Sequence, residues 1–172
     1  SNQKNYTPAE QGDVRYILAL DLATTTGWAL VRPGSVIDSG TIDLSVKKDQ
    51  SDTLRMVKFR NFLNQTVEEE PEFNQYGLVC WEMVEFVKYR MAYRVHVQLT
   101  SAAALWCHDN QVPHDAVGVT KIKQHATGKG NASKKMMLDG ARAKWPLVPI
   151  KDDNEADARW LADLMVQKLS VQ

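Results

Sequence analysis

Two short apolar runs, each ending in one acid, constrain the fold of this chain more than any other feature. Residues 14–20 are apolar apart from Arg15 and lead to Asp21, and residues 76–82 end in Glu82. Runs of this length and composition are typical of buried strands. If the two strands are central and parallel, Asp21 and Glu82 lie at one edge of the sheet. A carboxylate there is costly to desolvate unless it is paired, protonated or bound to a cation, so the pattern predicts a site.

The remaining periodicity indicates an α/β domain with a mixed sheet. Turns marked by Gly and Pro follow the first strand, and the simplest arrangement of the first three strands is an antiparallel meander. These strands are expected over residues 14–20, 28–31 and 37–44. Another strand is expected at 116–119, a short helical turn at 122–125, and helices at 52–69, 89–108, 134–145 and 155–169. Ser51 or Asp52 is a suitable cap for the first helix, and Pro71 ends it.

The length of 172 residues fits one domain that buries about 70% of the surface its unfolded chain exposes. We expect residues 1–13 to form a flexible polar tail and residues 14–172 to form the domain. Cys80 and Cys107 lie far apart in apolar segments, which is typical of reduced core residues in an intracellular protein. The sequence has neither a signal peptide nor an apolar run of 18 residues, so a soluble, cytoplasmic protein without a membrane partner is expected.

A third group of acids opens the last expected helix, in the segment Asp152-Asp153-Asn154-Glu155-Ala156-Asp157. Asp153 or Asn154 can cap this helix, while Asp157 is aligned with the apolar stripe of the helix and therefore faces the sheet. Asp21, Glu82 and Asp157 could converge into an oxygen-rich pocket. Such a pocket suits a hard divalent cation such as Mg²⁺, whereas no Cys and His grouping suits zinc. Two such ions can activate water and stabilise the departing oxygen in phosphodiester cleavage.

Charge is balanced overall but not along the chain. Lys and Arg number 21, as do Asp and Glu, so the net charge does not indicate an anionic partner. Between Val119 and Trp145, one acid, Asp139, accompanies seven basic residues, which are Lys121, Lys123, Lys129, Lys134, Lys135, Arg142 and Lys144. A basic segment in a neutral protein is typical of a surface that binds a polyanion. The alternative is a solvated loop.

Four segments together resemble a known family. They are Asp21 with Thr26-Gly27-Trp28, Glu82 after a strand, residues 122–134 (Ile-Lys-Gln-His-Ala-Thr-Gly-Lys-Gly-Asn-Ala-Ser-Lys), and Glu155-Ala156-Asp157-Ala158. Their order is that of the RuvC-like Holliday junction resolvases of the RNase H-like superfamily, and the resemblance spans residues 14–169. It implies a three-layer domain with a mixed five-stranded sheet and helices on both faces. It also implies a homodimeric, Mg²⁺-dependent endonuclease that resolves Holliday junctions or related branched DNA by paired nicks.

The resemblance assigns roles to the acids. The family's catalytic carboxylates, which hold two Mg²⁺ ions in each active site, are matched by Asp21, Glu82 and Asp157. Mn²⁺ is expected to substitute for Mg²⁺. The family commonly has a fourth acid three residues before the last Asp, where this chain has Asn154, whose carbonyl oxygen can bind a metal without adding charge. Asp153 or Glu155 could serve instead, and Asp153 ranks first because its i, i+4 offset from Asp157 keeps both on one face.

The resemblance also implies contacts with DNA. Lys123 and Lys134 match basic residues that the family places near the scissile phosphate, and the turn at residues 128–130 lets the backbone approach DNA closely. The DNA contacts expected in this basic segment are Lys121, Lys123, Lys129, Lys134 and Lys135. Residues 84–90 carry aromatic and cationic groups suited to an opened junction, where Arg90 can contact phosphate. The family's wedge aromatic corresponds to Phe86 or Tyr89.

Two other functions stay open at this point. An Asp after a strand followed by Thr-Thr-Thr-Gly resembles the first phosphate loop of the actin and sugar-kinase group, which would make the chain a small ATP-binding protein. Those proteins need two such domains and a second phosphate loop, which this chain lacks, so no nucleotide cofactor is expected. Asn154, standing where the family has an acid, is compatible with a non-catalytic nucleic-acid-binding relative of the resolvases.

Overall fold

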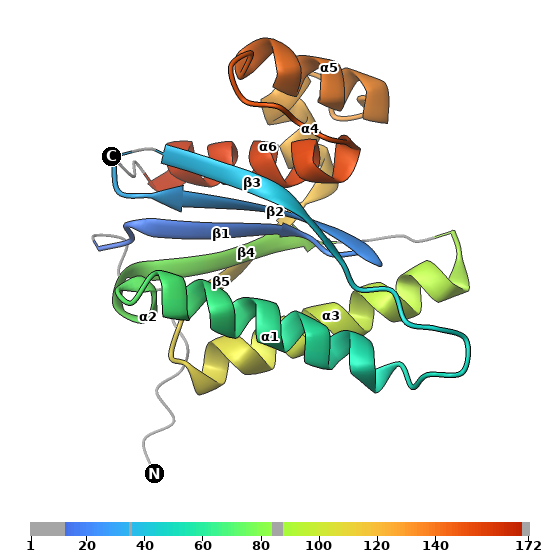
Figure 1. Cartoon of the computed structure of the whole chain (residues 1–172). Coiled ribbons are helices and arrows are strands. Elements are labelled where there is room, and N and C mark those ends of the chain that lie inside the picture. The colour runs from blue at the N-terminus through green and yellow to red at the C-terminus, as the bar shows by residue number, and fades with distance from the viewer. Residues whose placement is uncertain (1–12, 35, 84–87, 170–172) are drawn as a thin grey trace.

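The computed structural model describes residues 13–34, 36–83 and 88–169 (Figure 1). The strands in these residues are β1 (Tyr16–Asp21), β2 (Thr25–Arg32), β3 (Val36–Asp43), β4 (Gly77–Met83) and β5 (His114–Gly118). The helices are α1 (Thr53–Glu69), α2 (Phe73–Tyr76), α3 (Arg90–Asp109), α4 (Val119–Thr127), α5 (Lys134–Lys144) and α6 (Asp153–Leu169). The predicted tail falls almost entirely on residues 1–12, which lie outside the described part of the chain.

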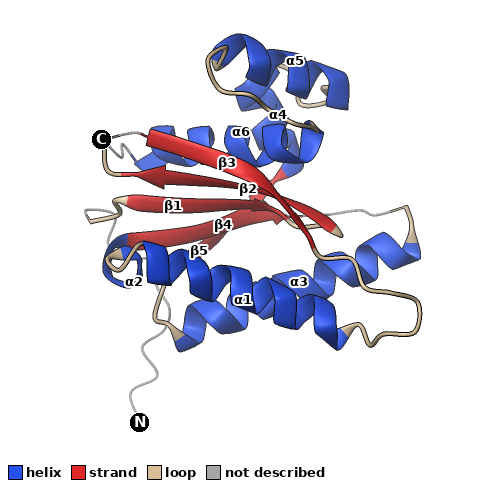
Figure 2. Cartoon of the chain, viewed as in Figure 1, coloured by secondary structure: helices blue, strands red, loops and turns tan. Residues whose placement is uncertain are grey.

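The strands form one five-stranded sheet in the order β3-β2-β1-β4-β5. The pairs β1–β2 and β2–β3 are antiparallel, whereas β1–β4 and β4–β5 are parallel, so the predicted meander with parallel central strands is confirmed. Figure 2 shows the strands as a single twisted layer between helices. Parallel strands need long connections, and here α1 with α2 lies between β1–β3 and β4, while α3 lies between β4 and β5.

Helices cover both faces of the sheet because the strand residues alternate between two cores. One face of the sheet packs against α1 and α3. Its strand residues include Leu18, Leu20, Val79 and Trp81, and the helices contribute Phe59 and Leu99. On the other face the strands pack against α6, through Ile17, Ala19, Leu78 and Cys80. Helices α4 and α5 lie beyond α6 on this side of the sheet (Figure 1). This is the predicted three-layer α/β arrangement.

Several predicted boundaries are wrong, among them the starts of β1 and β5, and local hydrogen bonds or glycines explain three of the differences. β2 begins at Thr25 rather than Trp28, because the Thr26 hydroxyl donates to the Ala23 carbonyl at 2.7 Å and closes the turn early. The strand predicted to continue through residue 119 ends at Gly118, whose backbone is extended, and the predicted single helical turn is the longer helix α4 (Val119–Thr127). Left-handed Gly128 (φ 76°) ends this helix. α6 begins at Asp153, since the Asp152 carboxylate accepts from the Glu155 backbone N–H at 3.0 Å and caps the helix in place of Asp153 or Asn154.

Both cysteines are core residues without a disulfide, as predicted. Cys80 and Cys107 are free and buried, and burial raises the pKa of the Cys107 thiol to about 12. Thiols held in this protonated state are poor nucleophiles, so neither cysteine is a candidate for catalysis. Among the described residues, no helix combines the length and apolar character needed to span a membrane.

Candidate active site

The strand register places Asp21 and Glu82 side by side. The parallel pairing of β1 with β4 aligns Leu20 with Trp81, so the next residues in each strand, Asp21 and Glu82, are neighbours. Side chains alternate along a strand, and Asp21 therefore projects on the same face as Ala19, the face covered by α6. The same alternation places Glu82 on this face, so two carboxylates meet at one edge of the sheet as predicted.

Helix α6 brings the third acid to this edge. Its first turn lies against β2 at Gly27, the register partner of Asp21, where an added Cβ would stand only 1.9 Å from the Asn154 carbonyl oxygen. This close approach places Asp157, one turn further along α6, within the electrostatic influence of Asp21 and Glu82. The three predicted carboxylates therefore gather in one place, although they come from three separate elements.

Burial raises the pKa of all three acids, and neighbouring carboxylates add to this effect at Asp21 and Asp157. Burial, followed by the charges of Asp157, Glu82 and Asp153, raises the pKa of Asp21 well above its usual value. Burial, followed by the charges of Glu82 and Asp153, raises the pKa of Asp157 to about 7. Burial also raises the pKa of Glu82, while the nearby Lys123 ammonium lowers it. The folded protein thus disfavours full ionisation of this group of acids.

The residues present fit a divalent cation. They offer carboxylate oxygens, the ligands that Mg²⁺ and Mn²⁺ prefer, and the buried Oδ1 of Asp157 has no hydrogen-bond partner in the described structure. A cation would offset the mutual repulsion that raises these pKa values. Among residues 13–34, 36–83 and 88–169, no three His, Cys, Asp or Glu side chains already stand in a metal-binding arrangement.

Asp153 is the acid beside this group at the start of α6. Its charge acts on both Asp21 and Asp157, and its Oδ2 lies 3.2 Å from the Lys134 ammonium. Glu155 is engaged elsewhere, because its carboxylate accepts from the Ser39 hydroxyl at 2.7 Å and from a backbone N–H at 2.9 Å. Asn154 lines a hollow next to the β1–β2 turn. Of the three residues considered for the fourth acid, Asp153 is the one whose charge acts on Asp21 and Asp157.

Two of the five predicted DNA-contacting lysines lie beside the acids. Lys134, at the start of α5, pairs with Asp153, and this contact raises the pKa of its ammonium group. Lys123, on α4, acts electrostatically on Glu82 and Asp157. The other three, which are exposed on α4, α5 and the turn between them, are Lys121, Lys129 and Lys135. Lys135 forms an ion pair with Asp139.

The predicted wedge region is only partly described. Phe86 lies outside the described residues. Tyr89 stands directly before α3 with an exposed ring, and the Lys88 ammonium lies 5.7 Å from the centre of that ring. Arg90 is the exposed first residue of α3. An exposed aromatic ring and cations thus follow β4 in the chain, and their role in DNA binding stays a prediction.

A buried polar network that the sequence analysis missed fixes α6 against the edge strand β3. The Arg159 guanidinium, 1% exposed, donates to the Ser39 hydroxyl through Nε at 3.1 Å and a terminal nitrogen at 2.7 Å. Ser39 in turn donates to Glu155, so one hydroxyl joins both α6 side chains. The i, i+4 spacing of Glu155 and Arg159 was the available signal. The network holds the helix that carries Asp153 and Asp157.

In the absence of divalent cations, we expect the melting temperature to fall as the pH rises from about 5 to about 8. The folded-state pKa of Asp157, about 7, lies above the ordinary value, so the folded protein retains a proton that the unfolded chain releases. This contribution to stability is complete below the unfolded pKa and is lost as the pH passes through the folded pKa. Melting curves in EDTA measure the effect.

Asp157→Asn should flatten this pH profile, while Asp139→Asn, an exposed change on α5, should leave it intact. Added Mg²⁺ should raise the melting temperature more at the higher pH, where the carboxylates are ionised. An Asp157→Asn profile with the wild-type slope would contradict the pKa assignment.

No protein-family model matches this sequence, and no curated protein matches it either. Similar solved structures exist. RuvC of Thermus thermophilus in complex with a Holliday junction substrate has a TM-score of 0.70 and 17% identity, covering 86% of this chain and 90% of that chain. Another Thermus thermophilus RuvC structure has a TM-score of 0.66 and 16% identity, and the match covers 91% of this chain and 97% of that chain.

The yeast mitochondrial Holliday junction resolvase Ydc2 is also similar, with a TM-score of 0.60 and 14% identity over 94% of this chain and 83% of that chain. These likenesses extend over nearly the whole domain rather than one motif. The chain therefore has the fold of the RuvC-like resolvases, and the fold that the four sequence segments implied is confirmed.

Proposed function

We propose that this protein is a divalent-metal-dependent endonuclease that resolves Holliday junctions or related branched DNA by paired nicks. The observation that carries the proposal is the convergence of Asp21, Glu82 and Asp157 on one face of the sheet edge, with Asp153 beside them. The similar RuvC structure with a bound Holliday junction supports branched DNA as the substrate class.

The proposed mechanism uses these acids as ligands. Two Mg²⁺ ions, or Mn²⁺ in their place, would supply activation of water and neutralisation of charge at the scissile phosphate. Asp21 would contribute to both ion sites and Glu82 and Asp157 to one each, with Asp153 as the fourth acid. Lys134, whose ammonium is already held beside Asp153, can contact a phosphate oxygen without losing its charge. Lys123 adds positive charge near Glu82.

The proposed DNA surface extends from the acids over α4 and α5. Lys121, Lys129 and Lys135 are exposed there, and left-handed Gly128 shapes the turn that presents Lys129. Such contacts to phosphate position the DNA but do not read its sequence, so binding should weaken as salt rises. Tyr89 and Arg90 would contact the opened centre of the junction from the other side of the acids.

We also propose that the protein is a homodimer, and an exposed apolar stripe on α3 supports this. Tyr93, Val97 and Leu105, at spacings of four and eight residues, are 54%, 42% and 65% exposed, and Met83 at the end of β4 is 45% exposed. Apolar side chains concentrated on one side of a helix are typical of a protein interface. Paired nicks need two active sites, which a second copy of this chain would supply.

Val97→Glu is expected to convert a dimer into a monomer, because the new carboxylate would be desolvated at the centre of the stripe. Light scattering after size-exclusion chromatography measures the mass, for which one chain accounts for 19.4 kDa. Leu147→Glu, an equally drastic change in an exposed loop outside α3, should keep the wild-type mass. A wild-type protein that is already monomeric would contradict the dimer.

The experiment that tests the proposed function is a gel assay of nicking on four-way, three-way, flap and linear DNA with Mg²⁺. Preferential, symmetrical nicking of branched DNA is the expected result. Junction binding without cleavage would favour a non-catalytic relative, and binding of ATP without DNA binding would favour a nucleotide-handling protein. We place the activity in the cytoplasm of a prokaryote or a phage-infected host, where free thiols such as Cys80 and Cys107 stay reduced.

A further inference from the structure

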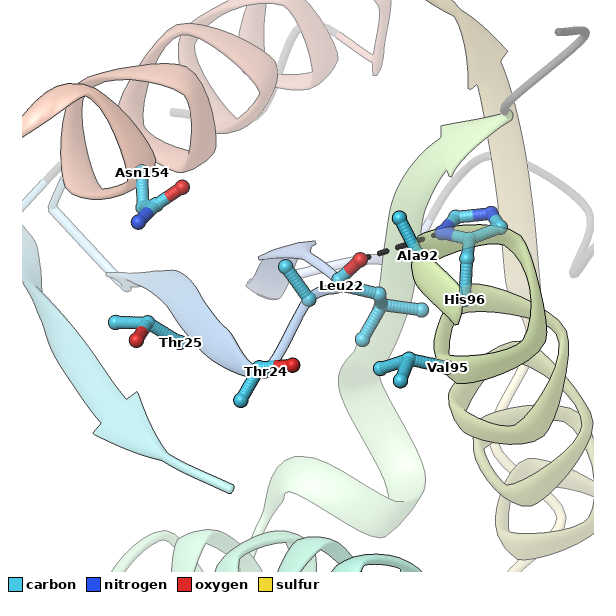
Figure 3. A pocket seen from close by; sticks show the side chains of 8 residues that line it. Leu22, Thr24, Thr25, Ala92, Val95, His96 and Asn154 are labelled. Atoms are coloured by element: carbon cyan, nitrogen blue, oxygen red, sulfur yellow. Dashed lines mark hydrogen bonds between the residues drawn. The ribbon is translucent and has the colours of Figure 1, made fainter. Parts of the chain in front are cut away.

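A hollow of about 300 Å³ opens beside the acids on the side of α3. It lies between the β1–β2 turn, whose first residue Leu22 directly follows Asp21, the first turns of α3, and the start of α6. Figure 3 shows Asn154 on one side and His96 with α3 on the other, with Leu22 and Thr24 between them. The hollow therefore adjoins the place where a scissile phosphate would lie.

The lining excludes several kinds of ligand. None of the eight described residues that line it is an acid, a lysine or an arginine. A phosphate group would require cations, and a divalent cation would require carboxylates. Leu22, Ala92 and Val95 provide an apolar surface, while Thr24, Thr25 and Asn154 provide polar groups. This combination suits a small, neutral group with a flat apolar face and a polar edge.

Three polar side chains in the lining do not pair with one another. Among the residues drawn in Figure 3, no hydrogen bond involves the side chain of Thr24, Thr25 or Asn154. The Asn154 carboxamide offers a donor and an acceptor side by side, the pattern that reads a base edge in DNA recognition. Its backbone is held in place, since the first turn of α6 lies directly on Gly27.

The opposite wall is fixed by His96. Its Nδ1 donates to the Leu22 carbonyl at 3.3 Å, because a carbonyl oxygen can only accept, and its Nε2 lies 3.4 Å from the Thr100 hydroxyl. The imidazole thus ties α3 to the residue that follows Asp21. A hollow whose walls are joined in this way keeps a constant position relative to the acids.

From this geometry we infer that the hollow binds one nucleobase of the strand being cut, at a nucleotide flanking the scissile phosphate, and that Asn154 discriminates between bases there. The inference rests on the proposed function, because it requires DNA at the acids. Bases at the centre of a branched DNA are already poorly stacked, so moving one into the hollow costs less than in a linear duplex. Sequence preference in cleavage would follow from this contact.

The test places 2-aminopurine, which fluoresces when unstacked, at each nucleotide flanking the cut in a four-way junction, in EDTA so that the DNA stays intact. The wild-type protein should raise the fluorescence severalfold at one position. Ala92→Leu, which fills the hollow from the exposed surface of α3, should abolish this rise and change junction affinity by less than about threefold. Ala143→Leu, the same change on the exposed surface of α5, should behave as wild type.

Cleavage provides the second readout. Across junctions that differ only in the flanking base, Asn154→Ala should reduce the ratio of kcat/KM between the best and worst base by about tenfold. Fluorescence that does not rise, a rise retained in Ala92→Leu, or an unchanged base preference in Asn154→Ala would overturn the assignment of the hollow. Failure of the wild-type protein to bind any junction would instead overturn the proposed function, so the two failures are distinguishable.

Discussion

Asp21→Asn is expected to abolish DNA cleavage, with a loss of more than about 10³-fold, while junction binding is kept or strengthened. Asp21 is the acid on which the charges of Asp157, Glu82 and Asp153 all act, so it lies at the centre of the group. Asparagine keeps the shape of the side chain but removes the charge that a divalent cation requires. It also removes negative charge that would repel the DNA phosphates.

Single-turnover nicking of a four-way junction in Mg²⁺ measures the loss, and fluorescence anisotropy measures binding. Asp115→Asn is a matched control, because Asp115 on β5 pairs with Lys168 of α6 and takes no part in the group of acids. The variant should also melt at a higher temperature than wild type in EDTA at neutral pH, since ionised Asp21 is disfavoured in the folded state. Unchanged nicking by Asp21→Asn would refute the site.

Gly27→Ala is expected to destabilise the protein by about 3 kcal/mol and to remove most of the nuclease activity. The new Cβ would lie 1.9 Å from the Asn154 carbonyl oxygen and 2.4 Å from its carbonyl carbon. Both contacts are with backbone, so no side-chain rotation can relieve them, and the first turn of α6 must move away from β2. That movement shifts Asp153 and Asp157 away from Asp21.

Urea unfolding and nicking assays measure the two effects. Gly140→Ala is the control, because its Cβ would meet only Trp160 at an ordinary 3.4 Å, and alanine in a helix interior is favoured by about 0.5 kcal/mol. Wild-type stability and activity in Gly27→Ala would show that α6 does not depend on this close contact.

The site costs the protein stability that its fold must offset. Like-charged groups with raised pKa values weaken the folded state in the absence of a cation. Asp21 and Glu82 end central strands, and Asp157 belongs to a helix held by the buried Arg159 network. Rigid elements of this kind keep repelling acids within reach of one another.

Much of the fold was predictable because its signals are local. Apolar runs ending in Asp21 and Glu82 identified the two central strands, and the helical stripe above Asp157 indicated that this acid faces the sheet. The boundaries were less predictable. Residues 24–26 allow more than one backbone conformation, and the hydrogen bond from the Thr26 hydroxyl to the Ala23 carbonyl selects the turn that is observed. Residues 118–119 likewise allow a strand or a helix, and here a helix starts at Val119 and ends at left-handed Gly128.

The sequence alone determined which strand or helix carries each acid, because each acid follows from the local pattern of its own element. The contacts of each acid, and the different surroundings of Asp153, Asn154 and Glu155, were decided only by the tertiary structure. Neighbours in sequence project around a helix in different directions, so three successive residues meet the acids, the hollow and Ser39 respectively. What each side chain meets depends on the strands packed beneath α6, and no local pattern contains that information.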